Sequence, residues 1–442
     1  MQLKALWALI ALVGVAALAW GWSVGSEAVP ARPGDQTIPA TADWYASLPL
    51  DPVAATDAYL SRIPASMRER GERYSDTRMQ AFVLRVLGLL LATAFLCSTR
   101  FAVQAGGLAA RVFRHRTLVD ASVALQYFAA LFVLGLPVEV YATFVRPHQF
   151  GFSDQAFGGW LGDSLVNWAV FTVFYVVGAL AIYGFIRRRP GQWVAWATAT
   201  YLVLRATYTL LSPQVIEPLT NSYQPLADGP QKQQILALAH ANGIHDVAVV
   251  TGDASRQTRL LNAHVSGVAG MARISVDDTT LKATSDAMLR AVVGHEIGHH
   301  VMNHEIQWIF TDTLVMAFGF LAIAVGTRAV IRLLGARWQI AATGDIASLP
   351  VFWGLFLLWG FASLPASNAV SRACEHQADL YGLNASQAPL GLAEFMIHDA
   401  DFVRLRPTAA EYALFYTHPS DAERVATAMQ WRAAQARLPA LR

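Results

Sequence analysis

The chain has 442 residues, of which 55% are hydrophobic and 14% are charged, with a formal net charge of +2. An average soluble domain is about 25% charged, so this composition favours a membrane protein. A near-neutral chain without a basic stripe argues against a nucleic-acid partner, and two cysteines are too few for a disulfide framework.

Seven apolar stretches approach the length of about 20 residues that crosses a bilayer. They cover residues 5–22, 80–98, 119–142, 163–186, 192–212, 306–326 and 348–366. The sequence therefore predicts a mainly α, polytopic membrane protein in which about seven transmembrane helices enclose a chamber within the lipid bilayer. Residues 1–22 are expected to remain as an N-terminal anchor, and a signal peptide cleaved near Gly25 is the alternative.

Three polar regions interrupt or follow the spans. They are a loop at 23–79, a segment at 213–305 after transmembrane helices two to five (80–212), and a tail at 367–442. Because the last two spans form a hairpin at 306–366, the segment and the tail emerge on the same side of the membrane. We expect them to build one mostly helical lobe with a small β element.

Within the segment, the pattern predicts a helix at 230–242 with Gly243 as its C-terminal cap. Two β-like runs follow, Val247–Val250 and Ala263–Val276. A second helix is expected to begin near Ser285, because serine and aspartate favour the start of a helix.

The second helix carries the sequence AVVGHEIGHH at 291–300. It contains H-E-x-x-H, in which His295 and His299 are four residues apart and share one face of a helix. Two such imidazoles bind one Zn²⁺, and Glu296 serves as general base toward water. The bare surface of Gly298 would let another backbone approach. A pair of histidines on a solvated helix face is the competing interpretation.

A catalytic zinc takes three protein ligands and keeps a further position open, so a third ligand is needed. The sequence SRACEHQADLYG at 371–382 supplies Glu375 as the candidate. Asp379 lies one helical turn later and is predicted to accept a hydrogen bond from a ligand histidine, which fixes the ring. For Glu375 taken alone, a solvated surface glutamate is the alternative.

Three other histidines compete as ligands. His300 points about 100° away from its neighbour on the same helix. His304 is only partly in line with the pair, and His376 adjoins the glutamate but faces elsewhere. We expect all three to be polar or structural residues.

These motifs resemble those of the type I CaaX prenyl endopeptidases, integral-membrane zinc metallopeptidases of the gluzincin class. The shared features are H-E-x-x-H at 295–299, S-R-x-x-E-x-x-A-D at 371–379, N-A-x-x-x-G at 262–267, an entry segment at 213–226 and H-P-S-x-x-x-R at 418–424. The resemblance covers residues 80–430.

The resemblance implies zinc-dependent cleavage of a peptide or membrane-protein substrate at a site that faces the chamber. One Zn²⁺ per chain would be bound by His295, His299 and Glu375. Glu296 would activate water and pass the proton to the leaving amine.

The resemblance also implies how a substrate would be bound. Four residues of one strand would pair with its backbone: Asn262, Ala263, His264 and Gly267. His418 or Arg424 would donate to the substrate carbonyl or the developing oxyanion. As ordinary structural residues, Asn262 would form a turn and His418 would cap the chain before Pro419.

The composition, rich in alanine and arginine, indicates a bacterial inner membrane and substrates broader than prenylated CaaX proteins. The signals for the membrane side of the lobe conflict. Arginine-rich short loops after spans two, four and six place the lobe outside the cytoplasm, whereas the resemblance implies a cytosolic face.

Two other function classes fit parts of the pattern. A polytopic transporter or receptor could bind a metal through the same histidines without hydrolysis, although it has no evident use for Glu296 or Asp379. A haem protein could use His295 as an axial ligand and would show a visible absorption band. The sequence does not predict an oligomeric state.

Overall fold

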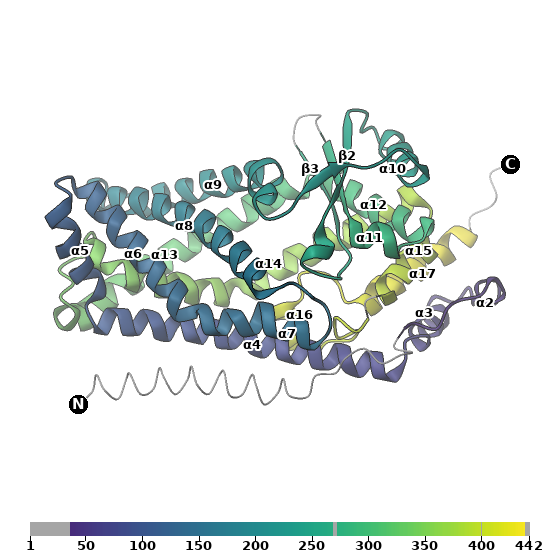
Figure 1. Ribbon diagram of the computed structural model, residues 1–442, viewed down its shortest axis with the longest axis horizontal. Helices are drawn as coiled ribbons and strands as arrows, with labels where there is room; N and C mark the ends of the chain where they lie inside the picture. Colours follow the sequence, from purple (N-terminus) through teal and green to yellow (C-terminus); the bar gives the residue numbers. More distant parts are fainter. Residues whose placement is uncertain (1–35, 268–271, 399, 438–442) are drawn as a thin grey trace.

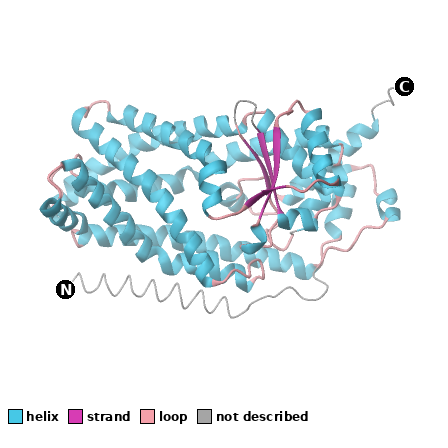
Figure 2. Cartoon of the chain, turned by 45° about the horizontal axis from the view of Figure 1, so that its top comes forward, coloured by secondary structure: helices cyan, strands magenta, loops and turns pink. Residues whose placement is uncertain are grey.

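The computed structural model describes residues 36–267, 272–398 and 400–437. Its long helices lie side by side in an elongated bundle, and a lobe that contains all the described strands lies at one end (Figures 1 and 2). The predicted first span and its alternative cleavage site lie outside the described residues.

Five helical segments of the described chain are long and apolar enough to cross a membrane. They are α4 (Ala65–Ser98), α6 (Arg116–Glu139) with its continuation through Val140–Val145 into α7 (Arg146–Gln149), α8 (Phe157–Arg188), α13 (His304–Trp338) and α14 (Leu349–Ser386). The prediction of a mainly α, polytopic membrane protein is confirmed. The fifth predicted span forms the shorter helix α9 (Trp193–Leu211), which contains Arg205 and is not one of these five. The count of seven spans stays a prediction.

Several charged side chains in or near the predicted spans form ion pairs, which lowers their cost in lipid. The ion pairs join Asp120 to Arg187 at 2.7 Å, Glu139 to Arg85 at 3.2 Å, Asp163 to Arg256 at 3.1 Å and Asp312 to Arg205 at 3.3 Å. Each pair connects residues far apart in the sequence, so these contacts fix helices against one another as well as neutralising charge.

The region 23–79 contains more helix than a polar loop would. It forms α2 (Ala42–Ser47), α3 (Pro52–Ser61) and the first turns of α4. Arg70 of α4 is buried, pairs with Asp401 at 3.0 Å and donates to the carbonyl oxygen of Phe150 at 2.7 Å. The charges that mark this stretch as polar in the sequence are therefore partly buried by contacts with the C-terminal region.

The lobe contains one four-stranded sheet in the order β1-β2-β4-β3. The strands are β1 (Tyr223–Pro225), β2 (Val247–Gly252), β3 (Ala263–Ser266) and β4 (Ala272–Asp277). β2 and β4 are parallel, and the two outer strands are antiparallel to their neighbours. Of the described strands, β3 therefore lies at one edge of the sheet with a free side.

The predicted helix at 230–242 is α10 (Pro230–Ala241), and Gly243 follows it with φ +81°, a value that favours glycine. Six more helices complete the set of α-helices in the described part of the chain. They are α5 (Phe101–Val112) at the far end of the bundle, and α11 (Asp278–Ala283), α12 (Asp286–Val301), α15 (Pro389–His398), α16 (Ala409–Phe415) and α17 (Asp421–Arg437) in or beside the lobe.

Helix α12 is buried on two faces at the centre of the lobe. Leu289, Val293 and Ile297 pack in one apolar cluster with β2, β4 and α10. Ala291 belongs to a second cluster formed with α3, α14, α15 and α17. The segment and the tail therefore share one core, as the hairpin between them predicts.

Candidate metal centre

The predicted metal-binding helix is α12, and its start is capped as expected. The side chain of Ser285 accepts a hydrogen bond from the backbone N–H of Met288 at 3.3 Å, and Asp286 occupies the first turn. Apolar side chains before the motif bury this helix. His295 and His299 consequently project from a rigid element.

The third-ligand motif is on α14, which is a single helix from the bundle into the lobe (Figure 1). The last predicted span and the predicted helix at 371–382 are thus continuous. This continuity places Glu375 and Asp379 beside α12 with no intervening loop. Both carboxylates are buried, at 4% and 1% exposed.

The two helices approach each other across glycines. A Cβ on Gly382 would lie 2.7 Å from the backbone nitrogen of His295, and one on Gly298 would lie 3.2 Å from Cα of Ala378. At Gly382 a side chain would force the backbones to shift, and at Gly298 it would make an unusually tight contact. The close approach expected at Gly298 is therefore present, and it brings the carboxylates of α14 within reach of the histidines of α12.

Three potential ligand atoms meet at this crossing. The Nε2 atoms of His295 and His299 are 3.0 Å apart, and they lie 3.2 and 3.5 Å from Oε2 of Glu375. Ligands about 2.0–2.1 Å from a tetrahedral zinc ion lie about 3.3 Å from one another. Oε2 of Glu375 is buried without a hydrogen-bond partner, and a metal ion would use its free lone pair by coordinating it. The donor set and its spacing fit a metal ion with one open position.

Asp379 lies behind His295 on the side away from these atoms. Its Oδ1 is 2.9 Å from Nδ1 of His295. Arg424 of α17 holds both oxygens of the same carboxylate, with Nη2 2.5 Å from Oδ1 and Nε 2.9 Å from Oδ2. Nη2 of Arg424 also lies 3.3 Å from Nδ1 of His295. A buried ion pair thus fixes the ring of His295.

Glu296 follows His295 on α12 and is half-buried. Burial raises the pKa of its carboxyl above the usual value, while the nearby rings of His295 and His299 oppose that shift. A carboxylate in such surroundings has a greater affinity for a proton than an exposed glutamate does.

His418 lies in the loop between α16 and α17. Its Nε2 is 3.3 Å from Oε1 of Glu375, and its Nδ1 is 2.9 Å from the hydroxyl of Thr417. The side chain is 54% exposed. His418 therefore reaches the ligand cluster from its open side, whereas Arg424 is buried behind it.

The four predicted substrate-binding residues lie on or beside β3, which packs against α12. The backbone of Asn262 is fixed by Thr280, with hydrogen bonds of 2.7 and 2.8 Å. Ala263 is buried, and Nε2 of His264 is 3.4 Å from Oε2 of Glu217. Gly267 has φ +118°, which only glycine adopts readily.

One buried histidine contacts the ligand cluster, although the sequence indicated only a polar or structural role for it. Nδ1 of His304 is 2.9 Å from Nδ1 of His299, so His304 contacts a candidate ligand from behind. Its position five residues beyond His299 was the only available signal. Among the described residues, the group that could hold a metal ion contains neither His300 nor His376.

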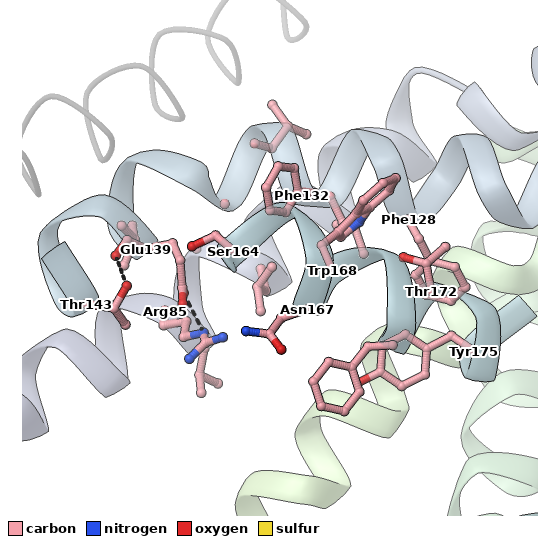
Figure 3. Close-up of a pocket in the computed structure, with 18 of the residues that line it drawn as sticks. Arg85, Phe128, Phe132, Glu139, Thr143, Ser164, Asn167, Trp168, Thr172 and Tyr175 are labelled. Carbon is pink, nitrogen blue, oxygen red and sulfur yellow. Dashed lines mark hydrogen bonds and ion pairs between the residues drawn. The ribbon is translucent and has the colours of Figure 1, made fainter. Parts of the chain in front are cut away.

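A cavity of about 850 Å³ opens within the bundle, lined mainly by α4, α6 and α8. In Figure 3 the ion pair of Arg85 and Glu139 lies toward the left, and Phe128 and Tyr175 lie toward the right, with the amide of Asn167 between them. The lining includes none of the predicted site residues. The cavity is amphipathic and separate from the ligand cluster.

Comparison with known proteins places these features in a family. Residues 225–432 match the family model described as Peptidase family M48, and residues 62–222 match the one described as CAAX prenyl protease N-terminal, five membrane helices. The first region contains the ligand cluster, and the second contains most of the bundle.

The curated relatives agree with both matches. The chain is 31% identical to the Uncharacterized metalloprotease YhfN of Bacillus subtilis, over 54% of this chain and 56% of that protein. It is 26% identical to the Probable CAAX prenyl protease 1 of Schizosaccharomyces pombe, over 70% of this chain and 65% of that protein. The alignments thus span less than two thirds of the length of these two relatives.

The fold has a solved counterpart along almost the whole chain. The crystal structure of S. mikatae Ste24p matches with a TM-score of 0.68 at 19% sequence identity, covering 97% of this chain and 99% of that one. The bundle, the lobe and the two family matches together show that this multi-pass membrane protein belongs to peptidase family M48, in the group that carries the CAAX prenyl protease N-terminal region.

Proposed function

We propose that the protein is a membrane-embedded zinc endopeptidase. One observation carries the proposal: Nε2 of His295, Nε2 of His299 and Oε2 of Glu375 form a triangle with sides of 3.0, 3.2 and 3.5 Å. Two imidazoles and one carboxylate are the ligand set of several zinc peptidases. When bound, zinc supplies a Lewis acid that makes water nucleophilic at neutral pH and polarises a carbonyl group.

Glu296 is the general base in this proposal. It accepts the proton of the attacking water and passes that proton to the amine that leaves when the peptide bond breaks. Burial, which raises its pKa, favours a carboxylate that takes up a proton during the reaction and then releases it.

His418 is proposed to stabilise the oxyanion. If the hydroxyl of Thr417 donates to Nδ1, Nε2 carries the hydrogen and lies 3.3 Å from Oε1 of Glu375, beside the ligand atoms. A preorganised donor at that position stabilises negative charge as it develops on the substrate carbonyl. Arg424 is assigned a positioning role instead, because its Nε and Nη2 both donate to the carboxylate of Asp379.

The substrate is proposed to bind as an added strand on the free edge of β3. Edge strands offer unpaired backbone groups to an extended peptide. Asn262, Ala263, His264 and Gly267 would supply the backbone or side-chain contacts. The rigid backbone of Asn262 and the packing of β3 on α12 would hold the peptide at a constant distance from Glu296.

The names of the relatives point to membrane-associated protein substrates. The amphipathic cavity would receive an apolar part of such a substrate at its aromatic end, while its charged end would contact a polar part. We propose substrates broader than prenylated CaaX proteins and a location in a bacterial inner membrane, in line with the bacterial relative. A reporter fused after Arg442 that is active only outside the cytoplasm would establish the side on which the lobe lies.

The decisive experiment compares the wild-type protein with Glu296→Gln, both purified at full length in detergent. We expect the variant to retain one zinc per chain and to lose hydrolysis of unfolded and membrane-derived peptides by about 10²–10⁴-fold, because only the proton transfer is removed. Peptides with and without a C-terminal prenylated cysteine would define the substrate class.

Glu305→Gln is the matched control. Glu305 is exposed at the start of α13, so the same chemical change there should leave hydrolysis unaltered. Full activity of Glu296→Gln would refute the mechanism. A wild-type protein that binds zinc but cleaves no peptide would favour the metal-binding transporter instead.

A further inference from the structure

His304 is fully buried at the first position of α13, directly after α12 ends. The turn between the two helices contains Asn303 with φ +55°. Asparagine tolerates this left-handed conformation better than most residues. The reversal is so tight that the ring of His304 returns to the last turn of α12, where His299 lies.

Two hydrogen bonds define the chemistry of the His304 ring. Its Nε2 is 3.3 Å from Oε1 of Gln377, and its Nδ1 is 2.9 Å from Nδ1 of His299. An amide oxygen can only accept, so Nε2 of His304 carries the hydrogen. In a neutral ring the other nitrogen is then an acceptor, and Nδ1 of His304 offers its lone pair to His299.

The ligand nitrogen of His299 requires the same distribution of hydrogens on the two rings. Nε2 of His299 converges with Nε2 of His295 and Oε2 of Glu375. To bind a metal ion, that nitrogen must keep its lone pair, so the hydrogen of His299 is on Nδ1. One hydrogen and one lone pair therefore meet in the 2.9 Å contact between the two rings. The glutamine and the ligand cluster independently select the same tautomers.

We propose that His304 is a positioning residue of the metal centre, which together with Gln377 holds His299 in the tautomer and orientation that bind the metal. This inference rests on the ligands assigned in the proposed function. His304 does for His299 what Asp379 does for His295, with one difference. Asp379 is an anion held by Arg424, whereas His304 is a neutral acceptor.

The neutral charge of the His304 acceptor matters because the site is buried. Each carboxylate near the centre needs compensation, since an unpaired buried charge is costly. A neutral imidazole orients the second ligand without adding another buried anion that would itself need a cationic partner. No other orienting partner of His299 Nδ1 is found among the described contacts of that atom.

The test measures zinc affinity by competition with a chelator on the full-length protein in detergent. His304→Leu removes the acceptor, and we expect affinity to fall by about 10–100-fold, as for other residues that orient metal-binding histidines. His304→Asn should recover most of the loss, because its amide oxygen can replace the Nδ1 lone pair. Gln377→Leu should give a smaller loss, because His304 is then free to change tautomer.

His300→Ala is the control. His300 is next to His299 on α12 but is not one of the residues that could hold the metal ion. Wild-type affinity in His304→Leu would overturn the proposal, and so would an asparagine variant as weak as the leucine variant. If His304→Leu fails to fold, the affinity of Gln377→Leu decides: a wild-type value refutes the proposal. Zinc affinity is measured without a peptide substrate, so failure of the proposed peptidase activity would be seen separately.

Discussion

The two halves of α14 pack in different ways, although they form one continuous helix. In the bundle half, buried side chains such as Leu349 and Phe352 interdigitate with apolar residues of neighbouring helices. In the lobe half, α14 meets α12 across Gly382 and buries Glu375 and Asp379. Large apolar contacts tolerate adjustment, whereas a close backbone crossing with buried charges has little freedom. The comparison predicts unequal responses to substitution.

The largest effect on stability is expected in the lobe half from Arg424→Met. This change leaves the carboxylate of Asp379 buried without its ion-pair partner. Breaking a buried pair in this way costs about 3–5 kcal/mol. We expect a marked fall in the melting temperature of the detergent-solubilised protein. Zinc binding should also weaken, because Arg424 no longer holds in place the Asp379 carboxylate that orients His295.

Arg406→Met provides the matched control. Arg406 forms an ion pair with Asp57 at the surface, and the side chains of Arg406 and Asp57 are 72% and 66% exposed. Exposed pairs contribute about 0–1 kcal/mol, so the melting temperature should hardly change. Equal effects of the two substitutions would show that the burial of the Arg424 pair is not what stabilises the lobe.

A smaller but still clear effect is expected from Gly382→Ala. The added Cβ would lie 2.7 Å from the nitrogen of His295 and force α12 and α14 apart. Overpacking of this kind costs about 1–3 kcal/mol, and the wider crossing would also lengthen the distance from Glu375 to the histidines. Both the melting temperature and the zinc content should therefore fall.

Gly162→Ala separates this steric effect from the general effect of glycine in helices. Gly162 is on α8, and a Cβ there would meet no atom within 4 Å. Alanine is a better helix former than glycine by about 1 kcal/mol, so this variant should be neutral or slightly more stable. A loss of zinc in both variants would contradict the steric explanation.

The comparison also explains how much of the molecule could be predicted from its sequence. Apolar runs of membrane-spanning length can be located directly in the sequence, so the bundle half of α14 was predictable. H-E-x-x-H and the later glutamate have fixed spacings on helices, which allowed His295, His299 and Glu375 to be proposed together. These signals depend on neighbours in the sequence.

Other features depend on contacts between distant segments and left no local signal. The start of α4 at Ala65 was hidden because Arg70 is charged in sequence yet buried in the fold. The partner of Arg424 is Asp379, 45 residues earlier in the chain. The role of His304 needs a turn at Asn303 whose conformation the spacing did not reveal.

The smallest effect is expected from Phe352→Leu in the bundle half of α14. Phe352 is 7% exposed and contacts Phe320, Tyr183 and Trp193. Neighbouring side chains can close part of the space that a leucine leaves, so the cost should stay below about 1.5 kcal/mol. Zinc content should equal that of the wild type, because the ligand cluster lies in the other half of the helix. Loss of zinc in this variant would show that the bundle half transmits packing changes along α14, and the two halves would then have to be treated as one mechanical unit.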